Sequence, residues 1–490
     1  MLLRADTVGK QQCERRGAST DYKGVTVAVP STPAEWLPVL LGRLEKRLPQ
    51  IRLDRRYCNG DPDLPEMGRN LRKSWQMFQK KAITDFGGLA ASSFTDRMRL
   101  IGVRIGDSDD HPALPVLRRI MRDNRVIVQV QDAVADAIET GYGYLVVTDG
   151  YLMREKPESF YADPDPMRPW KARASVALGR DTVAKRDFAV VMANGVAQEF
   201  SRGISEDSEH LSGLSAGQWA PTGRAWGFEG GVPVAIFERP KGRGLVSPHK
   251  GAIDRINLGK LQRLVTTAMQ AFKQRAIKPG PNGEGLPDED QDGNSIDWGK
   301  ILEPAPGAMW DIPVPIDIWE SQPTDIRPLL EGEKTDLRDF AAVVGVPVMM
   351  LMPEQQSATG AAQIPMQFVL KARGEIDRFK PALDLALVYA LRDAGVELGD
   401  DTVESLWADP EFVTVTERFA AAVQAKGAGL SERTIKRDIL HMSPDQIRQD
   451  EADKGADMLA AALLGVTSGS NSAATQRPDP SGAGDTATDS

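Results

Sequence analysis

One stretch of the sequence combines acidic and turn-forming residues in the order that a calcium-binding loop requires. The run Asp288-Glu289-Asp290-Gln291-Asp292-Gly293 supplies the alternating oxygen ligands and the turn glycine of such a loop. The twelfth position, where a bidentate Glu completes the calcium site, is Gly299, and the prolines on the N-terminal side cannot form the entering helix. We therefore favour an acidic, solvated loop at residues 288–297, with cation binding as the alternative.

Neither the histidines nor any phosphate-binding motif indicates other chemistry. None of the histidines has a second His or a Cys at metal-ligand spacing; they are His111, His210, His249 and His441. The sequence contains no G-x-x-x-x-G-K-[ST] and no G-x-G-x-x-G. We therefore expect no enzyme, no metal site and no cofactor.

Length and charge restrict the class of protein. The 490 residues are 41% hydrophobic and carry a net charge of −9, and their length suggests two to four structural units. A chain this acidic lacks the general excess of Lys and Arg that coats DNA. The two cysteines, Cys13 and Cys58, are too few for a disulfide scaffold or a four-thiolate zinc site, which fits a reducing compartment.

Hydropathy gives no sign of a membrane segment. The best apolar run, Phe340 to Met352, falls short of the roughly 18 residues that a span needs, and it contains Gly345 and Pro347. The N-terminal residues show no apolar core of a secretion signal. We expect a protein that has no membrane partner and that is cytosolic or is assembled in a cytosol.

The most basic segment is a predicted long helix over residues 247–278. Its apolar residues recur three or four apart and form one face; they are Leu258, Leu261, Val265, Ala268, Phe272 and Ala276. The same spacing puts polar residues on a second face, which consists of Lys260, Arg263, Thr267, Gln270 and Gln274. Other cations lie at Lys250, Arg255, Lys273, Arg275 and Lys278, against the single acid Asp254. A solvated amphipathic helix is the simplest alternative.

The segments on either side of this helix predict an α+β protein. Before it, periodicity indicates a helix from Thr32 to Leu48, a turn-rich break at 57–62, a strand at 101–105, one or two helices in 112–140 and a β-rich region at 150–240. After it come a Pro- and Gly-rich excursion at 279–325, a helix ending near Val344, a flexible loop, and a long helix at 363–394 that Pro381 should kink or split. Helices at 411–427, 431–440 and 443–464 precede a Ser- and Gly-rich end that should be disordered.

The order of these features resembles the portal proteins of tailed bacteriophages, especially the long-tailed type, over about residues 35 to 455. The matching stretches are degenerate, so their order carries the resemblance; they are Tyr57–Pro65, Asp96–Arg104, Gly141–Tyr144, Asp163-Pro164, Val232–Phe237, Gln274-Arg275 and Gln356–Ala362. The chain departs from the family at Cys58, where a Tyr is common, at the loosely matched 244–247, and in the acidity of 279–300.

The resemblance implies a portal-like fold and a virion protein at one capsid vertex. It implies a wing at 1–246, stem helices at 247–278 and 326–344, a projecting clip at 279–325, a tunnel loop at 345–362, a long kinked wing helix at 363–394, a helical crown at 395–467 and a disordered tail at 468–490. The ring, usually of twelve subunits, would form a channel for double-stranded DNA during packaging and ejection. Its partners would be the terminase, the head–tail adaptor, and the major capsid and scaffolding proteins.

The resemblance also assigns candidate residues to these parts. The stem and DNA channel candidates are Lys260, Arg263, Lys273, Arg275 and Lys278. The tunnel-loop candidates are Met349, Met350, Met352, Glu354, Gln355, Gln356, Ser357 and Thr359. The clip candidates are Asp288, Asp290, Asp292, Trp298 and Trp310. The basic face could either contact DNA or pair with the neighbouring stem. We expect Val346–Met352 to pack within the ring.

Two other interpretations remain at this stage. An unrecognised DNA-processing enzyme would need phosphate or metal machinery that the motif search did not find. Another phage structural ring protein, such as a head–tail adaptor, is normally far shorter than 490 residues.

Overall fold

The computed structural model describes the following residues: 18–20, 26–65, 73–106, 111–204, 213–214, 218–271, 275–277, 286–289, 292–301, 318–320, 322, 324–352, 366–411 and 415–469. The chain divides into two compact units. The first comprises Met1–Leu100 and Arg104–Phe412, and the second comprises Ile101–Val103 and Val413–Ser490. The α+β class expected from the sequence is confirmed.

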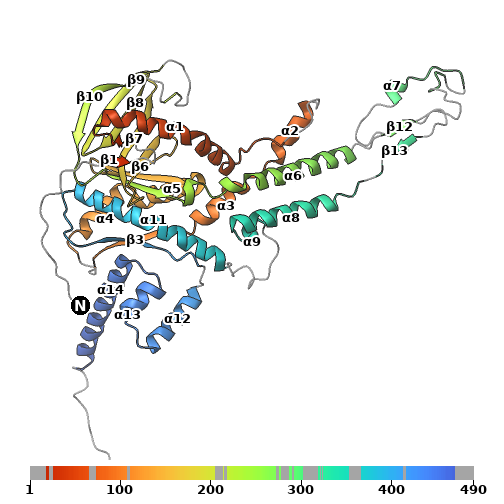
Figure 1. Cartoon of the computed structure of the whole chain (residues 1–490). Helices are drawn as coiled ribbons and strands as arrows, with labels where there is room; N and C mark the ends of the chain where they lie inside the picture. The colour runs from red at the N-terminus through yellow and green to blue at the C-terminus, as the bar shows by residue number, and fades with distance from the viewer. Residues whose placement is uncertain are drawn as a thin grey trace, which may run out of the picture. The chain divides into compact units, whose positions relative to one another are not determined.

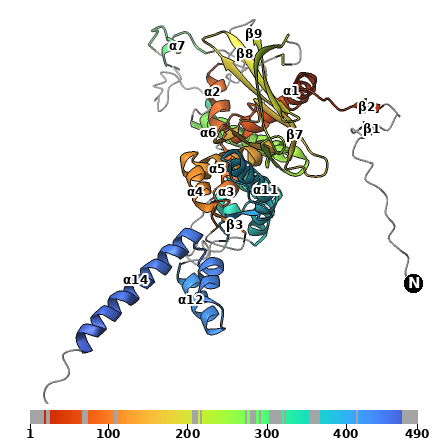
Figure 2. The same cartoon turned by 90° about the vertical axis from the view of Figure 1, so that its left-hand side faces the viewer.

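The largest sheet lies in the first unit and is antiparallel, with strand order β10-β9-β8-β7-β6 (Figures 1 and 2). Its strands are β6 (Phe160–Pro164), β7 (Ala172–Asp181), β8 (Arg186–Ala193), β9 (Val196–Gly203) and β10 (Ala220–Gly227). Helix α1 (Pro33–Cys58) packs on this sheet, and its leucines share a buried core with alternate residues of the strands. A short pair formed by β1 (Ala18–Thr20) and β2 (Thr26–Ala28) precedes α1.

Helix α1 begins where the sequence predicted and ends ten residues later. Thr32 is the N-cap, and its side-chain oxygen accepts a hydrogen bond from the Glu35 backbone N–H at 3.3 Å. The predicted end at Leu48 and the predicted break at 57–58 are wrong, because the helix continues through Pro49 to Cys58. Ile51, Tyr57 and Cys58 are buried, and that burial offsets the backbone hydrogen bond that Pro49 cannot make.

A second, three-stranded sheet has the order β11-β4-β5 and lies between helices. Its strands are β4 (Tyr142–Thr148), β5 (Tyr151–Glu155) and β11 (Val234–Glu238). Helices α5 (Val126–Thr140) and α11 (Met366–Asp393) both contact β4, β5 and β11. Helix α11 spans its whole length without a break at Pro381, so the predicted split is wrong. Gly141 ends α5 in the left-handed conformation, at the predicted end of the helical region.

Smaller helices complete this part of the first unit. They are α2 (Lys73–Ala82), α3 (Phe86–Thr95) and α4 (Leu114–Asp123), with two single 3-10 turns at Pro240–Gly242 and Ser247–His249. The remaining strands are β3 (Leu100–Ile105), whose residues Ile101–Val103 belong to the second unit, and β14 (Val403–Trp407) of the first. Strand β14 lies within the range that the sequence assigned to the crown, whereas the second unit's main segment begins at Val413.

Two helices of the first unit pack side by side in opposite directions (Figure 1). They are α6 (Lys250–Ala271) and α8 (Arg327–Val344). Beyond them, β12 (Arg275–Ile277) and β13 (Ile318–Glu320) form an antiparallel ladder in which Ala276 faces Trp319. The helix predicted over 247–278 is therefore shorter, because residues 275–277 form a strand. The short helices α7 (Trp298–Ile301) and α9 (Val348–Leu351) lie on either side of α8 in sequence.

The second unit is helical. It contains α12 (Val415–Gly427), α13 (Glu432–Thr434), a π-helical turn at Ile435–Ile439 and α14 (Pro444–Gly469). The predicted helix starts at 431 and 443 have N-caps, since Ser431 caps α13 and the Ser443 hydroxyl accepts the Gln446 N–H at 3.2 Å. In the part of the chain that the structure describes, no helix is both long and apolar enough to cross a membrane.

Candidate functional site

The helix pair α6–α8 holds the cations that the sequence singled out. Arg255 of α6 pairs with Asp336 of α8, with Nε and Oδ1 2.7 Å apart. Further along α6, the Arg263 Nε lies 3.1 Å from Glu333 Oε2. Residue numbers rise along α6 as they fall along α8, so these contacts fix the antiparallel register of the pair. The polar face of α6 therefore packs against α8 of the same chain.

Lys260 is enclosed at the junction of three elements. Its ammonium donates to the Thr84 hydroxyl at 2.7 Å and lies 3.5 Å from Glu333 Oε1. The same nitrogen sits 4.7 Å from the centre of the Phe86 ring, a cation–π contact. Burial lowers the pKa of Lys260, and the Glu333 carboxylate opposes that shift. Glu333 thus neutralises two cations, a role that the sequence did not reveal because the partners are 70 or more residues apart.

The apolar residues of α6 face outward in part. Leu258, Val265 and Met269 are seven and four residues apart, which puts them on one face; we call them the outer stripe. Leu258 is 38% exposed and Met269 is 47% exposed, whereas Leu261 is buried. The sequence placed Leu258 and Leu261 on the same apolar face. The difference arises because α8 packs on the charged side of α6, so that the outer stripe stays partly exposed to solvent.

The start of α6 is fixed to α1. Lys250 forms an ion pair with Asp54, whose side chain is completely buried, and the Tyr57 hydroxyl donates to Asp254 Oδ1 at 2.7 Å. Burial is the main cause that raises the pKa of Tyr57, and its hydrogen bond to Asp254 adds to it. The N-terminal end of α6 is therefore held by α1, the helix that packs on the large sheet.

Of the three other predicted stem cations, the structure describes one. Arg275 lies in β12, opposite Glu320 in the ladder, and not in the helix. Lys273 and Lys278 lie outside the described residues. Their assignment to a DNA channel stays a prediction, as does that of Lys260 and Arg263.

The segment predicted as a tunnel loop begins with a helix. Met349 and Met350 lie on α9 and are half-buried, and Met352 is its C-cap residue. Helix α9 contacts α3 and α8, so this part of the loop is packed within the chain. The other candidates, Glu354, Gln355, Gln356, Ser357 and Thr359, lie outside the described residues.

Gly345 joins α8 to this segment in the left-handed conformation, with φ at 82°. A Cβ added at Gly345 would lie 2.0 Å from the Lys371 Nζ of α11. The same ammonium lies 3.4 Å from the Val344 carbonyl oxygen, one of the last carbonyls of α8. Lys371 therefore occupies the space that a side chain at position 345 would need.

The acidic stretch forms a closed turn. Glu289 bridges to Ser295, the Ile296 N–H donates to the Asp288 carbonyl at 2.8 Å, and the Trp298 indole N–H donates to the Pro287 carbonyl at 2.8 Å. Asp292 is exposed, and Asp290 and Trp310 lie outside the described residues. Among the residues that the structure describes, no group of three His, Cys, Asp or Glu side chains is placed to hold a metal ion.

One motif with the spacing of a catalytic site lies in a structural context that differs from that of the site. Gly213-Leu214-Ser215-Ala216-Gly217 has the G-x-S-x-G pattern of a nucleophile elbow, which requires a turn from a strand into a helix. Here it lies between β9 and β10, which are antiparallel neighbours in one sheet. Ser215 itself lies outside the described residues. The strand-to-strand connection does not match the elbow.

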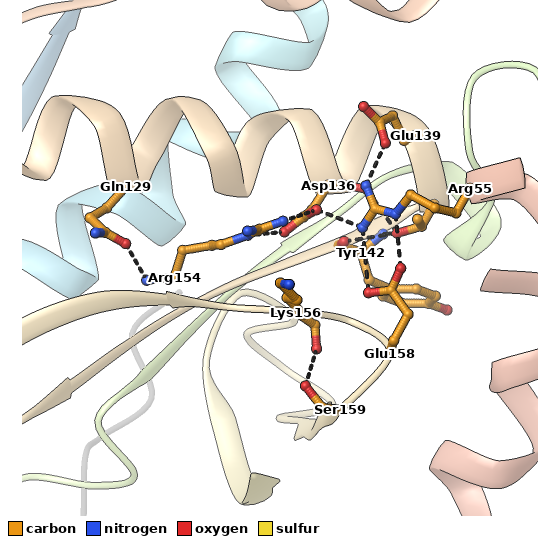
Figure 3. A network of polar contacts seen from close by, with 10 residues as sticks. Arg55, Gln129, Asp136, Glu139, Tyr142, Arg154, Lys156, Glu158 and Ser159 are labelled. Carbon is orange, nitrogen blue, oxygen red and sulfur yellow. Dashed lines mark hydrogen bonds and ion pairs between the residues drawn. The ribbon is translucent and has the colours of Figure 1, made fainter. Parts of the chain in front are cut away.

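A cluster of ion pairs around the buried Asp136 joins α1, α5 and β5 (Figure 3). Asp136 is almost fully buried and accepts from two guanidinium groups, with Arg55 Nη2 at 2.7 Å and Arg154 Nη2 at 2.6 Å. Arg55 also pairs with Glu139 and with Glu158. Burial raises the pKa of Glu139, and the Arg55 charge opposes the shift. Each charge has a partner of opposite sign, so the cluster cross-links the elements and leaves no group free for chemistry.

Comparisons with known proteins gave matches in structure alone. No family model matches the sequence, and no curated protein matches it. The chain is similar in structure to the neck of an empty GTA particle with C6 symmetry, at 15% identity over 77% of this chain and 96% of that one, with a TM-score of 0.41. It is similar to the neck of a native GTA particle with C12 symmetry, at 14% identity over 72% and 88%, with a TM-score of 0.39.

A third similar structure is an HK97-family phage portal protein from Corynebacterium diphtheriae. The identity is 11% over 69% of this chain and 93% of that one, and the TM-score is 0.29. These structures include a portal protein, the family that the sequence resembles.

Proposed function

We propose that this chain is a phage portal protein that assembles into a ring and provides a channel for DNA. The observation that carries the proposal is the outer stripe on α6. A helix that turns its charged face to its own partner and leaves Leu258 and Met269 exposed has an apolar surface available to another chain. A ring of identical subunits covers such a surface on every copy at once.

The arrangement of the helix pair supports the same proposal. Helices α6 and α8 are antiparallel, and the chain between them returns through the β12–β13 ladder. The family has two stem helices separated by a clip, and helix α11 follows in the order that the resemblance implies. The wing, stem, clip, tunnel loop and crown assignments are part of this proposal.

Charge supports a channel that does not grip DNA. Each Lys or Arg that binds a phosphate strengthens the complex, and a ring multiplies that effect. Here Arg255, Lys260 and Arg263 are paired with acids of α8. Twelve copies of a chain with net charge −9 would carry about −108, so the ring repels the DNA backbone.

Native mass spectrometry with negative-stain imaging tests the proposal. We expect a ring with a central hole near twelve times 53.4 kDa, about 640 kDa. The double variant Leu258→Glu/Met269→Glu should shift the population to monomers, because it places charges on the outer stripe. Val183→Glu is the matched control, since Val183 is 94% exposed in the turn between β7 and β8. A stable dimer with no larger species, or a ring that the double variant leaves intact, would contradict the role of this stripe.

A further inference from the structure

A cavity of about 510 Å³ lies where the 3-10 turns before α6 meet the end of α8 and the first half of α11. Its lining is strongly basic in an otherwise acidic chain. The cations are Arg239, Lys241, Arg243, Lys371 and Arg378. His249 also lines the cavity, and Glu375 is its one carboxylate. With His249 neutral, the lining carries a net charge of +4.

Only part of this charge is neutralised inside the protein. The Arg239 Nη2 lies 2.8 Å from Glu375 Oε1, and Arg378 reaches the other oxygen of Glu375 at 3.9 Å. Lys241 and Arg243 are exposed, and among the described residues neither has an acidic partner. The cavity therefore contains cations that an external anion can pair with.

The turn that carries Lys241 and Arg243 has an ordered backbone. Lys241 and Gly242 both adopt positive φ, at 61° and 58°. The turn is closed by a hydrogen bond from the Gly242 N–H to the Arg239 carbonyl at 2.9 Å, and the Arg239 guanidinium donates to the Arg243 carbonyl at 3.0 Å. Because the turn is already ordered, binding an anion there costs little additional backbone entropy.

We propose that this cavity binds a phosphate group. Guanidinium groups offer paired donors that match phosphate oxygens, and a lysine adds a point charge. A single carboxylate ligand would duplicate what Glu375 already supplies to Arg239 and would leave most of the positive charge without a partner. A phosphate carries more charge and more acceptor oxygens in a small volume. The proposal goes beyond the channel function and does not depend on ring assembly.

Two sources supply such a group, the backbone of a nucleic acid and a free phosphate compound. Isothermal titration of the full-length chain with inorganic pyrophosphate and with a short duplex DNA distinguishes them. Pyrophosphate binding that the duplex displaces assigns the cavity to a nucleic acid backbone. Pyrophosphate binding that the duplex does not displace assigns it to a free phosphate compound. Either result supports the proposal if it depends on the cavity cations.

The dependence is tested with Lys241→Gln/Arg243→Gln, which removes two cations that have no acidic partner among the described residues and breaks no internal ion pair. We expect pyrophosphate affinity to fall about tenfold or more. If DNA is the ligand, the slope of log affinity against log salt should decrease by about 2, near 0.9 for each lost contact. Lys156→Gln/Lys185→Gln is the charge-matched control on exposed residues that do not line the cavity. Circular dichroism verifies that both variants remain folded.

Three results would overturn the proposal. The first is that neither probe binds to the wild-type chain at low salt. The second is that the cavity variant and the control variant lose affinity equally, which would place the binding elsewhere. The third is that a polyglutamate peptide binds more tightly than pyrophosphate and depends on the same cations, which would make the ligand a carboxylate. Because every arm works on a monomer, a failure here is separate from a failure of the ring.

Discussion

The large sheet with α1 and the C-terminal helical unit differ in how much of their apolar surface they bury. The sheet region has a continuous core in which Leu40, Leu44 and Phe200 are almost fully buried. The core cluster of the C-terminal unit is made of Ala422, Ala425 and Ile435. The same unit exposes Phe419 at 57% and Val423 at 72%. The first region is stable through its own packing, whereas the second has apolar surface left over.

The ion pairs around Asp136, in the first unit, differ in the same way from those of the C-terminal unit. Asp136 is buried, the charged side chains around it are at most 27% exposed, and each one has a partner of opposite charge. In the C-terminal unit Lys454 pairs with Glu432 and Asp450 on the surface. Hydrogen bonds from Lys436 and then Lys454 hold the pKa of Asp450 below its usual value. Solvent screens such pairs, so they contribute little to stability. The following substitutions test this contrast.

The largest effect is expected from Asp136→Ala. Two guanidinium groups lose their shared partner, and breaking a buried ion pair from one side costs about 3–5 kcal/mol of unfolding free energy. Urea unfolding followed by circular dichroism measures the change. Glu432→Ala in the C-terminal unit is the matched control and should leave the midpoint unchanged. Equal losses in the two variants would remove the contrast between the regions.

The second largest loss of unfolding free energy is expected from Leu40→Ala. Leu40 is fully buried between α1 and the large sheet, and truncating a buried leucine costs about 2–5 kcal/mol. Leu459→Ala, at a site that is 63% exposed on α14, should change the unfolding free energy by no more than about 0.5 kcal/mol. The same urea titration compares them. If Leu459→Ala proves as costly as Leu40→Ala, the C-terminal unit has a core that its own residues do not explain.

Glu333→Gln should give an intermediate effect on the helix pair. It keeps the shape of the side chain but removes the charge that neutralises Lys260 and Arg263, at a cost of about 1–2 kcal/mol. Glu331→Gln, two residues away and largely exposed, is the control and should have no measurable effect. Thermal unfolding at low and high salt provides the measurement. A salt dependence that is identical for both variants would show that the Glu333 pairs are as screened as surface ones.

The smallest effect is expected at His249. Burial, and then the charge of Lys371, lowers the pKa of His249 below its usual value near 6.5. The unfolded chain therefore binds a proton more readily than the folded one, and stability should fall as the pH drops below that value. His249→Gln should flatten the pH dependence of the unfolding midpoint between pH 5 and 7. A midpoint that rises on acidification in the wild type relative to the variant would reverse the sign and contradict this environment.

Local signals predicted the parts of the structure that local chemistry determines. The caps at Thr32, Ser431 and Ser443 and the left-handed end at Gly141 follow from the residue type at a helix end. The α+β class and the β-rich region at 150–240 follow from periodicity and turn residues.

Features that depend on distant partners escaped the sequence. The orientation of α6 depends on Glu333 and Asp336 in another helix, which the spacing of residues within α6 could not reveal. Helix α1 passes Pro49 because a distant core buries its last turns. The basic cavity had a visible signal in the dense run Arg239-Pro240-Lys241-Gly242-Arg243, but its other half comes from α11, more than a hundred residues later.

Gly345 has a consequence for the tolerance of this gene to mutation. Every amino acid other than glycine brings a Cβ into the position that the Lys371 ammonium occupies, and the positive φ adds a conformational cost. Any missense change in the codon for residue 345 therefore disturbs the end of α8 and a cation of the basic cavity together. A deep mutational scan should find most missense variants at this codon depleted, because the positive φ is strained for a residue with a Cβ even if the flexible Lys371 side chain moves aside.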